Sequence, residues 1–194
     1  MRRLLFVCAV LTSLAMSWPI DRLERSIARV LLPSGMCTAF SIHTKAARFV
    51  TASHCGTLEG ASINGQSVVQ VLEATSGEAG LTVFQLAQGS PALRLGAKPK
   101  RGDEVLVAGY SAAPVLLFFE GLHVADSVPV DGVPVQLMSA PGFQGMSGAP
   151  VINRRRQVVG VMMGGAQITP PVPTTVSFNA IYQELARVLA KYGE

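Results

Sequence analysis

The chain has 194 residues, of which 49% are hydrophobic and 14% are charged. This composition excludes a disordered chain and predicts a packed core in one large or two small domains. The formal net charge of +4 is too small to indicate a nucleic-acid-binding protein. Nineteen glycines and twelve prolines are spread along the chain and predict many turns, as in an all-β protein.

The N-terminal segment has the pattern of a secretory signal. A basic start at Arg2 and Arg3 precedes an uncharged run over residues 4–16, and small residues precede a possible cut after Ser17. We therefore expect a signal peptide at 1–17, a secreted or periplasmic mature chain, and no membrane association after cleavage. The alternative is an uncleaved anchor, for which the run is short.

Short strand candidates, separated by turns, follow in chain order. The first half contains them at 27–32, 37–43, 48–52, 62–72 and 81–86. A looser stretch at 87–101, rich in glycine and proline, is predicted to connect two halves. The second half contains candidates at 104–109, 115–124, 133–139, 149–152, 157–163 and 174–178. This pattern favours one or two antiparallel barrels or a sandwich.

The C-terminal segment has helical periodicity instead. Apolar side chains recur on one helical face at Ile181, Leu185, Val188 and Leu189. Asn179 is a predicted N-cap and Gly193 a predicted stop. We expect one amphipathic helix that packs against the β-structure.

Ser147 lies in a glycine-rich bend. Gly145 and Gly148 flank it closely, and glycines permit backbone angles that let N–H groups converge on one point. The N–H groups of Gly145 and Ser147 are therefore candidates for an oxyanion hole. A Gly-x-Ser-Gly sequence alone is common in turns. Here it precedes two apolar strand candidates, and this context favours a catalytic role for Ser147.

His54 follows an apolar strand and precedes Cys55, whereas His43 and His123 have no motif around them and are interpreted as structural. Cys8 lies in the signal, so Cys37 and Cys55 remain as an even pair suited to one disulfide in an oxidising compartment. Two buried free thiols are the alternative. A bridge between them would fix the loop that carries the His54 imidazole.

With these two segments, the chain resembles the chymotrypsin-like serine peptidases, in particular the bacterial trypsin-like and HtrA-like branch. The matching stretches are 49–55, 95–110 and 140–151. The resemblance implies an all-β fold of two antiparallel six-stranded β-barrels, an active site between them and a closing C-terminal α-helix. The implied organisation is a signal peptide at 1–17, an N-terminal barrel at 18–88, a connection at 89–100, a C-terminal barrel at 101–178 and a helix at 179–194.

The chain departs from the family pattern at three points. Gly80 stands where the family has the acid of its triad, and Glu78, two residues earlier, is the tentative replacement that orients His54. Met146 replaces the aspartate that binds a freed N-terminus, so activation by cutting a propeptide is not expected. The third departure is that we expect no accessory peptide-binding domain after the predicted helix.

The family's substrate pocket maps onto Pro141, Met162, Met163, Gly164 and Gly165. None of these residues is charged, so the pocket is expected to accept small or medium apolar side chains and to reject charged ones.

The predicted function is that of a serine endopeptidase, with Ser147 as nucleophile and His54 as general base. It would act on polypeptides without a cofactor or metal, and without nucleic acid as a partner. The alternative is a catalytically degenerate protein of the same fold that binds peptides or a protein partner, which Gly80 favours. An esterase of the α/β-hydrolase type is excluded because there the serine precedes the histidine.

Overall fold

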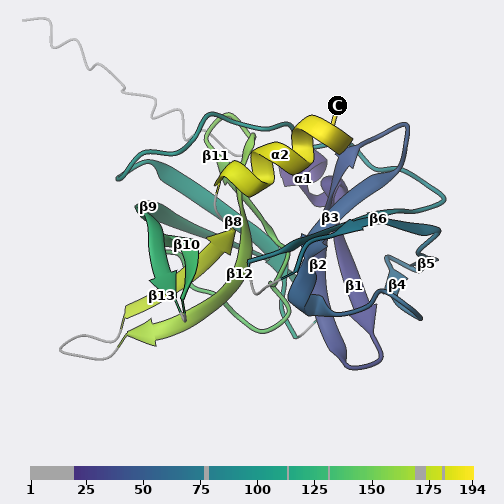
Figure 1. The fold of residues 1–194 in the computed structure, drawn as a ribbon, viewed down its shortest axis with the longest axis horizontal. Helices are drawn as coiled ribbons and strands as arrows, with labels where there is room; N and C mark the ends of the chain where they lie inside the picture. Colours follow the sequence, from purple (N-terminus) through teal and green to yellow (C-terminus); the bar gives the residue numbers. More distant parts are fainter. Residues whose placement is uncertain (1–19, 77–78, 113, 131, 169–173, 181) are drawn as a thin grey trace, which may run out of the picture.

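The computed structural model describes residues 20–76, 79–112, 114–130, 132–168, 174–180 and 182–194. The predicted signal peptide and Glu78 lie outside these residues. Within them, two β-structures lie side by side, and a C-terminal helix lies across both (Figure 1). No helix in the described part of the chain is long and apolar enough to cross a membrane.

The N-terminal half is a seven-stranded antiparallel sheet that follows a short helix, α1 (Ile20–Ser26). Its strands are β1 (Ile27–Leu32), β2 (Gly35–His43), β3 (Arg48–Ala52), β4 (Ser62–Ile63), β5 (Gln66–Ser67), β6 (Gln70–Ala74) and β7 (Leu81–Gln85). They pair in the order β5-β4-β1-β2-β3-β7-β6. Strands β5 and β6 therefore form the two ends of the sheet, which has seven strands and curves into a half-barrel.

The C-terminal half is a closed six-stranded barrel. It contains β8 (Glu104–Tyr110), β9 (Leu116–Val130), β10 (Val133–Met138), β11 (Pro150–Asn153), β12 (Val158–Ile168) and β13 (Thr174–Ala180). The predicted all-β class with a C-terminal helix is confirmed.

Two apolar clusters form the core: one joins the N-terminal sheet to parts of β8, β11 and β12, and the other lies within the C-terminal barrel. In the N-terminal sheet Phe40, Phe49 and Phe84 are fully buried, and the rings of Phe49 and Phe84 stack at 5.8 Å across the β3–β7 pair. Met138, Met146 and Met162 are fully buried in the C-terminal barrel. Burial of side chains of this size is the main source of stability for both halves.

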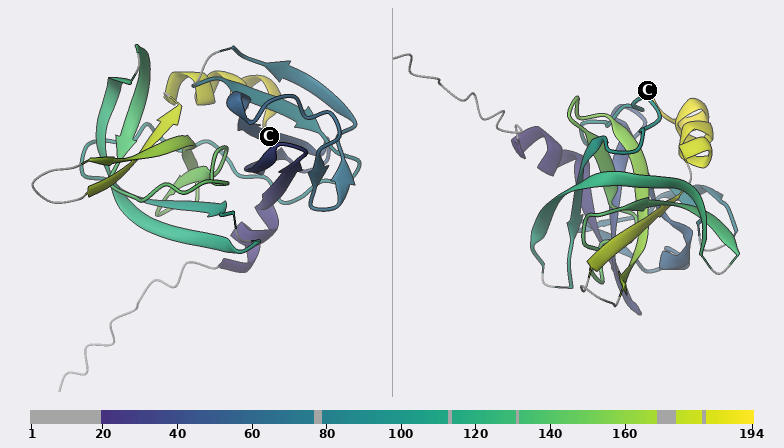
Figure 2. Two further views of the ribbon diagram at one scale, coloured as in Figure 1. Left: turned by 90° about the horizontal axis from the view of Figure 1, so that it is seen from below. Right: turned by 90° about the vertical axis from the view of Figure 1, so that its left-hand side faces the viewer.

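Helix α2 (Tyr182–Tyr192) joins the two halves, as Figure 2 shows from two further sides. Its apolar face is buried through Leu185, Val188 and Leu189, and it contacts β12 as well as β2 and β7. Gly193 N–H donates to the Leu189 carbonyl at 2.9 Å and ends the helix where the sequence predicted.

Two local predictions are wrong, and one short helix was not predicted. Residues 62–72 form three strands rather than one, because Asn64 and Gly65 take positive φ angles of 47° and 83° and turn the chain back. Asn179 lies within β13, paired with Gln136 and Met162, and is not the N-cap of α2. Helix α1 was not predicted, because seven residues give too short a periodic pattern.

Candidate active site

His54 lies in a short 3₁₀ turn, Ser53–Cys55, directly after β3. Two hydrogen bonds made by Ser53 hold this turn against the start of β7. Ser53 N–H donates to the Gly80 carbonyl at 2.8 Å, and the hydroxyls of Ser53 and Thr82 lie 3.1 Å apart. His54 itself is exposed. The residue before His54 is therefore fixed, and the His54 side chain lies at the surface just after β3.

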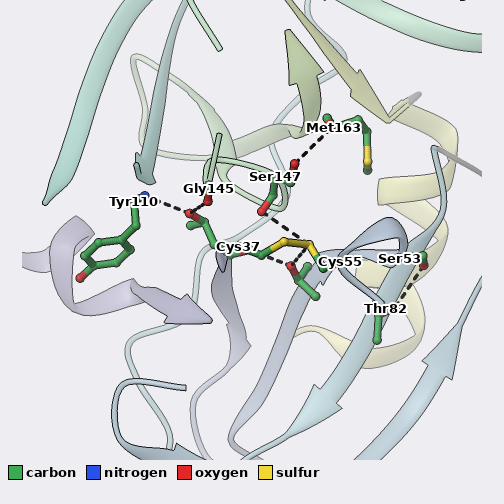
Figure 3. Close-up of a disulfide and its surroundings, with 10 residues drawn as sticks. Cys37, Ser53, Cys55, Thr82, Tyr110, Gly145, Ser147 and Met163 are labelled. Atoms are coloured by element: carbon green, nitrogen blue, oxygen red, sulfur yellow. Dashed lines mark hydrogen bonds between the residues drawn. A yellow bond between two sulfur atoms is a disulfide. The ribbon is translucent and has the colours of Figure 1, made fainter. Parts of the chain in front are cut away.

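Cys37 of β2 and Cys55 of the turn form a disulfide, with Cα atoms 6.2 Å apart (Figure 3). This confirms the predicted pairing. The Thr51 hydroxyl lies 3.6 Å from the Cys55 sulfur, inside the same hairpin. The covalent link and the hairpin together fix the residue that follows His54.

The bend that carries Ser147 depends on two glycines. Gly145 and Gly148 have φ angles of +97° and +85°, in the region that favours glycine. A β-carbon on Gly148 would overlap the Thr38 carbonyl oxygen and the Thr51 hydroxyl. The bend therefore lies directly against strands β2 and β3, with no room for a side chain at Gly148.

The two predicted segments meet at the backbone of Ser147. Thr38 N–H donates to the Ser147 carbonyl at 2.8 Å, and the Cys55 sulfur lies 3.9 Å from the same oxygen. The residue that follows His54 thus touches the residue predicted as nucleophile, although 92 positions separate them. The structure brings together the His54 turn and the Ser147 bend.

The side chain of Thr38 makes a second link between the halves. Its hydroxyl donates to the Gly145 carbonyl at 2.9 Å and accepts from Tyr110 N–H at 2.9 Å (Figure 3). Thr38 is fully buried. One residue of the N-terminal sheet therefore fixes both the end of β8 and the start of the bend.

The Ser147 hydroxyl donates to the Met163 carbonyl at 3.2 Å, as Figure 3 shows. Met163 lies on β12, and the same strand accepts a bond of 2.7 Å from Gly148 N–H at the Met162 carbonyl. The Ser147 side chain is half-buried. Its oxygen points toward the wall of the predicted substrate pocket.

The residues of that predicted pocket lie next to one another. Met162 and Met163 are buried, Pro141 and Gly164 are half-buried, and Gly165 is exposed. A β-carbon on Gly142 would overlap the Met162 methyl group and would lie 3.1 Å from Gly165 Cα. The two walls, residues 141–142 and 164–165, are therefore in contact in this structure.

A large cavity that the sequence did not predict opens beside His54. It measures about 1140 Å³ and extends from the His54 turn over β4, β5 and β6. Its lining includes Leu58, Val68 and Val71 with a rim of small polar residues. The cavity lies where the ends of the sheet, β5 and β6, leave the half-barrel unclosed. The Asn64-Gly65 pair was the one sequence signal for this opening.

Within the described ranges, no group of three or more His, Cys, Asp or Glu side chains is placed to hold a metal ion.

Residues 37–161 match the family model described as a trypsin-like peptidase domain. Among solved structures, the Rv3671c protease in its inactive form aligns with a TM-score of 0.69 and 24% identity over 90% of this chain and 92% of that one. The active form of the Rv3671c protease from M. tuberculosis aligns with a TM-score of 0.70 and 22% identity over 90% and 83%. None of the curated proteins compared with the chain matches it. At these identities the structural likeness concerns the fold, which is that of the chymotrypsin-like peptidases.

Proposed function

The chain belongs to the trypsin-like peptidase domain family, and from this premise we propose that it is a serine endopeptidase that cleaves polypeptides through an acyl-enzyme on Ser147. The observation that supports the proposal most strongly is the contact between the two motifs. The backbone of Ser147 is hydrogen-bonded to Thr38 and touches Cys55, which directly follows His54. Nucleophile and base are thereby carried on adjoining, mutually fixed segments.

In the proposed mechanism, His54 takes the proton from the Ser147 hydroxyl as its oxygen bonds to the substrate carbonyl carbon. The backbone N–H groups of Gly145 and Ser147 stabilise the oxyanion, a contribution of about 3–4 kcal/mol per donor in related chemistry. His54 then gives the proton to the leaving amine, and water hydrolyses the ester by the same route. The Ser147 hydroxyl, which now donates to the Met163 carbonyl, must first rotate toward His54.

Glu78 is the proposed acid that orients His54. The Gly80 carbonyl, two positions after Glu78 in the sequence, accepts a hydrogen bond from Ser53 N–H next to His54, and this proximity in sequence supports the proposal. Glu78→Gln is expected to lower kcat by orders of magnitude, up to about 10⁴-fold as for other triad acids, with little change in stability. The measurement is kcat and kcat/KM on a peptide substrate, with the exposed Glu120→Gln as control. An unchanged kcat in Glu78→Gln would eliminate Glu78 from the mechanism.

The proposed specificity is for small or medium apolar residues before the cut bond. The walls made by Pro141, Met162 and Gly165 offer no charged partner, so a basic or acidic side chain would be left unpaired there. Because Gly142 and Gly165 are in contact, substrate must also part these walls. Preference for arginine or lysine substrates would refute this part of the proposal.

A second candidate is a binding protein that retains the fold without turnover. Two observations favour it: the Ser147 hydroxyl is engaged by the Met163 carbonyl, and the pocket walls touch. In that case the cavity of about 1140 Å³ beside His54 would hold a bound segment rather than a substrate.

Covalent labelling with a fluorophosphonate separates the two candidates. The proposal expects labelling of the native chain, no labelling of Ser147→Ala, and labelling slowed at least about 10³-fold in His54→Ala. Ser53→Ala, which removes the other serine next to His54, is the matched control and should still label. If the folded native protein is not labelled, the peptidase proposal is refuted and the binding protein remains as the candidate.

The proposed location is secreted or periplasmic. The disulfide between Cys37 and Cys55 is of the kind that oxidising compartments preserve. Mass determination of protein recovered from culture medium or periplasm tests this, with a mature start after Ser17 as the expected result.

A further inference from the structure

A second pocket lies away from the proposed active site, where α1, the connection and the β11–β12 hairpin meet. It has a volume of about 380 Å³ and four arginines line it: Arg22, Arg94, Arg155 and Arg156. No aspartate or glutamate is among its lining residues, and it shares none of them with the cavity beside His54. We call it the arginine pocket.

The hairpin that supplies two of these arginines has a fixed backbone. The Asn153 side-chain oxygen accepts from Arg155 N–H at 2.9 Å and from Gln157 N–H at 3.0 Å. Arg156 N–H donates to the Asn153 carbonyl at 2.9 Å. The hairpin therefore presents both side chains from an ordered turn, which reduces the entropy lost on binding a ligand.

Arg156 has a φ of +61°, a conformation that favours glycine or asparagine over arginine. A residue that breaks a local backbone preference is most simply retained for what its side chain does. Here that side chain lines a pocket together with three other guanidinium groups.

The other two arginines are held from separate elements. Val158 N–H donates to the Arg94 carbonyl at 2.8 Å, which joins the connection to the start of β12. The buried hydroxyl of Ser26 donates to the Arg22 carbonyl at 2.9 Å and forms part of the pocket floor. Three segments distant in sequence thus converge on one pocket.

The positive charge of the arginine pocket is largely uncompensated. Among the described residues, no salt bridge involves Arg22, Arg155 or Arg156. Hydrogen bonds from Thr44 are the main cause of the lowered pKa of Glu194, and the charges of His43 and then Arg94 lower it less. By contrast Arg154, in the same hairpin, pairs with Glu104 at 2.7 Å.

We propose that the arginine pocket binds a phosphate ester group. Guanidinium groups match phosphate oxygens with paired N–H donors, and a phosphate monoester carries nearly two negative charges and several acceptor oxygens for more than one arginine. A carboxylate would engage one guanidinium and leave the others unpaired. The volume of about 380 Å³ suits a single headgroup rather than a polymer. The group belongs to a soluble phosphate monoester or to the headgroup of phosphatidic acid, which is also a phosphate monoester.

The test is isothermal titration of the full chain with glycerol 3-phosphate, and co-sedimentation with vesicles containing phosphatidic acid against vesicles of phosphatidylcholine alone. We expect saturable binding that weakens as NaCl rises, because the charges are exposed. The double variant Arg155→Gln/Arg156→Gln should weaken binding at least about tenfold. Arg154→Gln, the matched control from the same hairpin, should change it less than about twofold.

A third variant distinguishes binding from folding. Arg156→Gly relieves the backbone strain, so the melting temperature should rise while affinity falls. Saturable binding of glycerol 3-phosphate alone identifies a soluble ligand, and pocket-dependent binding of vesicles containing phosphatidic acid identifies a lipid. The proposal is overturned if native protein binds neither probe, or if Arg154→Gln weakens binding as much as the double variant. None of these readouts depends on peptidase activity.

Discussion

At the scale of single residues, Gly148 decides whether the two halves can meet. It combines a φ of +85° with a site where a β-carbon would overlap the Thr38 carbonyl and the Thr51 hydroxyl. The backbone of the Ser147 bend can rest on β2 and β3 only because this residue has no side chain.

We therefore expect Gly148→Ala to be strongly destabilising, by about 3 kcal/mol or more, because strain and overlap add. Gly132 is the matched control: its φ is +81°, but an added β-carbon would meet nothing within 4 Å. Gly132→Ala should cost only about 1–2 kcal/mol of backbone strain. Urea unfolding of both variants measures the difference, and equal losses would contradict the role given to Gly148.

The disulfide between Cys37 and Cys55 gives a second prediction at this scale. It links residues 18 positions apart, for which loop closure in the unfolded chain predicts stabilisation of about 3 kcal/mol. The Cys37→Ala/Cys55→Ala variant should lose about that much in urea unfolding. Thiol counting on denatured, unreduced mature protein should find no free thiol, and two would refute the bridge.

At the scale of elements, Glu73 ties α2 to β6. Its carboxylate accepts from Lys191 Nζ at 2.8 Å and the Tyr192 hydroxyl at 2.9 Å, and it also pairs with Arg187. Hydrogen bonds from Arg187 first, then Lys191 and Tyr192, lower the pKa of Glu73 to about 2. One residue of an end strand thus holds the helix to the half-barrel.

The lowered pKa predicts a pH dependence of stability. Because folding depresses the pKa from 4.5 to about 2, the stabilisation is complete above pH 4.5 and is lost as the pH falls toward 2. Glu73→Gln should cost about 1 kcal/mol at pH 6 and very little at pH 2. Unfolding across this range is the measurement, with the exposed Glu120→Gln as control; a loss independent of pH would show that packing alone matters at Glu73.

Some strand boundaries could be predicted from the sequence and others could not. Strands β1 and β3 begin and end at the predicted residues because apolar runs stop there at charged or turn residues. Strands β4 to β6 were missed as separate elements, since two-residue strands have no periodicity to detect. Asn179 was misassigned because its residue type favours a cap, whereas pairing with Gln136 places it in a strand.

Part of the functional residues could likewise be predicted from the sequence, and part could not. Motifs containing Ser147 and His54 could be found locally, because glycines and cysteines signal special backbone geometry. The arginine pocket could not, because its parts lie on three segments that only tertiary packing brings together. In the sequence alone, the three arginines at 154–156 stand between two apolar strand candidates and are most simply a solvated hairpin turn.

At the scale of the whole molecule, Thr38 couples the halves. Its backbone N–H bonds Ser147, and its hydroxyl bonds both Gly145 and Tyr110, so the C-terminal barrel docks on one buried residue of β2. The geometry of the proposed site therefore depends on how the halves meet, rather than on either half alone.

Thr38→Val keeps the shape of the side chain but removes the hydroxyl to which the Gly145 carbonyl and the Tyr110 N–H are hydrogen-bonded. We expect a loss of about 2–4 kcal/mol in the free energy of unfolding, together with slower fluorophosphonate labelling. Thr82→Val is the control for stability, since its hydroxyl bonds Ser53 within the N-terminal half and does not reach the C-terminal barrel. A smaller loss in Thr38→Val than in Thr82→Val would show that docking does not rely on this link.

The position of α2 has a consequence for synthesis. The half-barrel is made first, yet Glu73 on its end strand is held by Arg187, Lys191 and Tyr192, more than a hundred residues later in the chain. While those residues are still inside the ribosome, β6 lacks its clamp. We therefore expect the half-barrel to become fully held, and the proposed site beside it to become competent, only after α2 has been made and has docked.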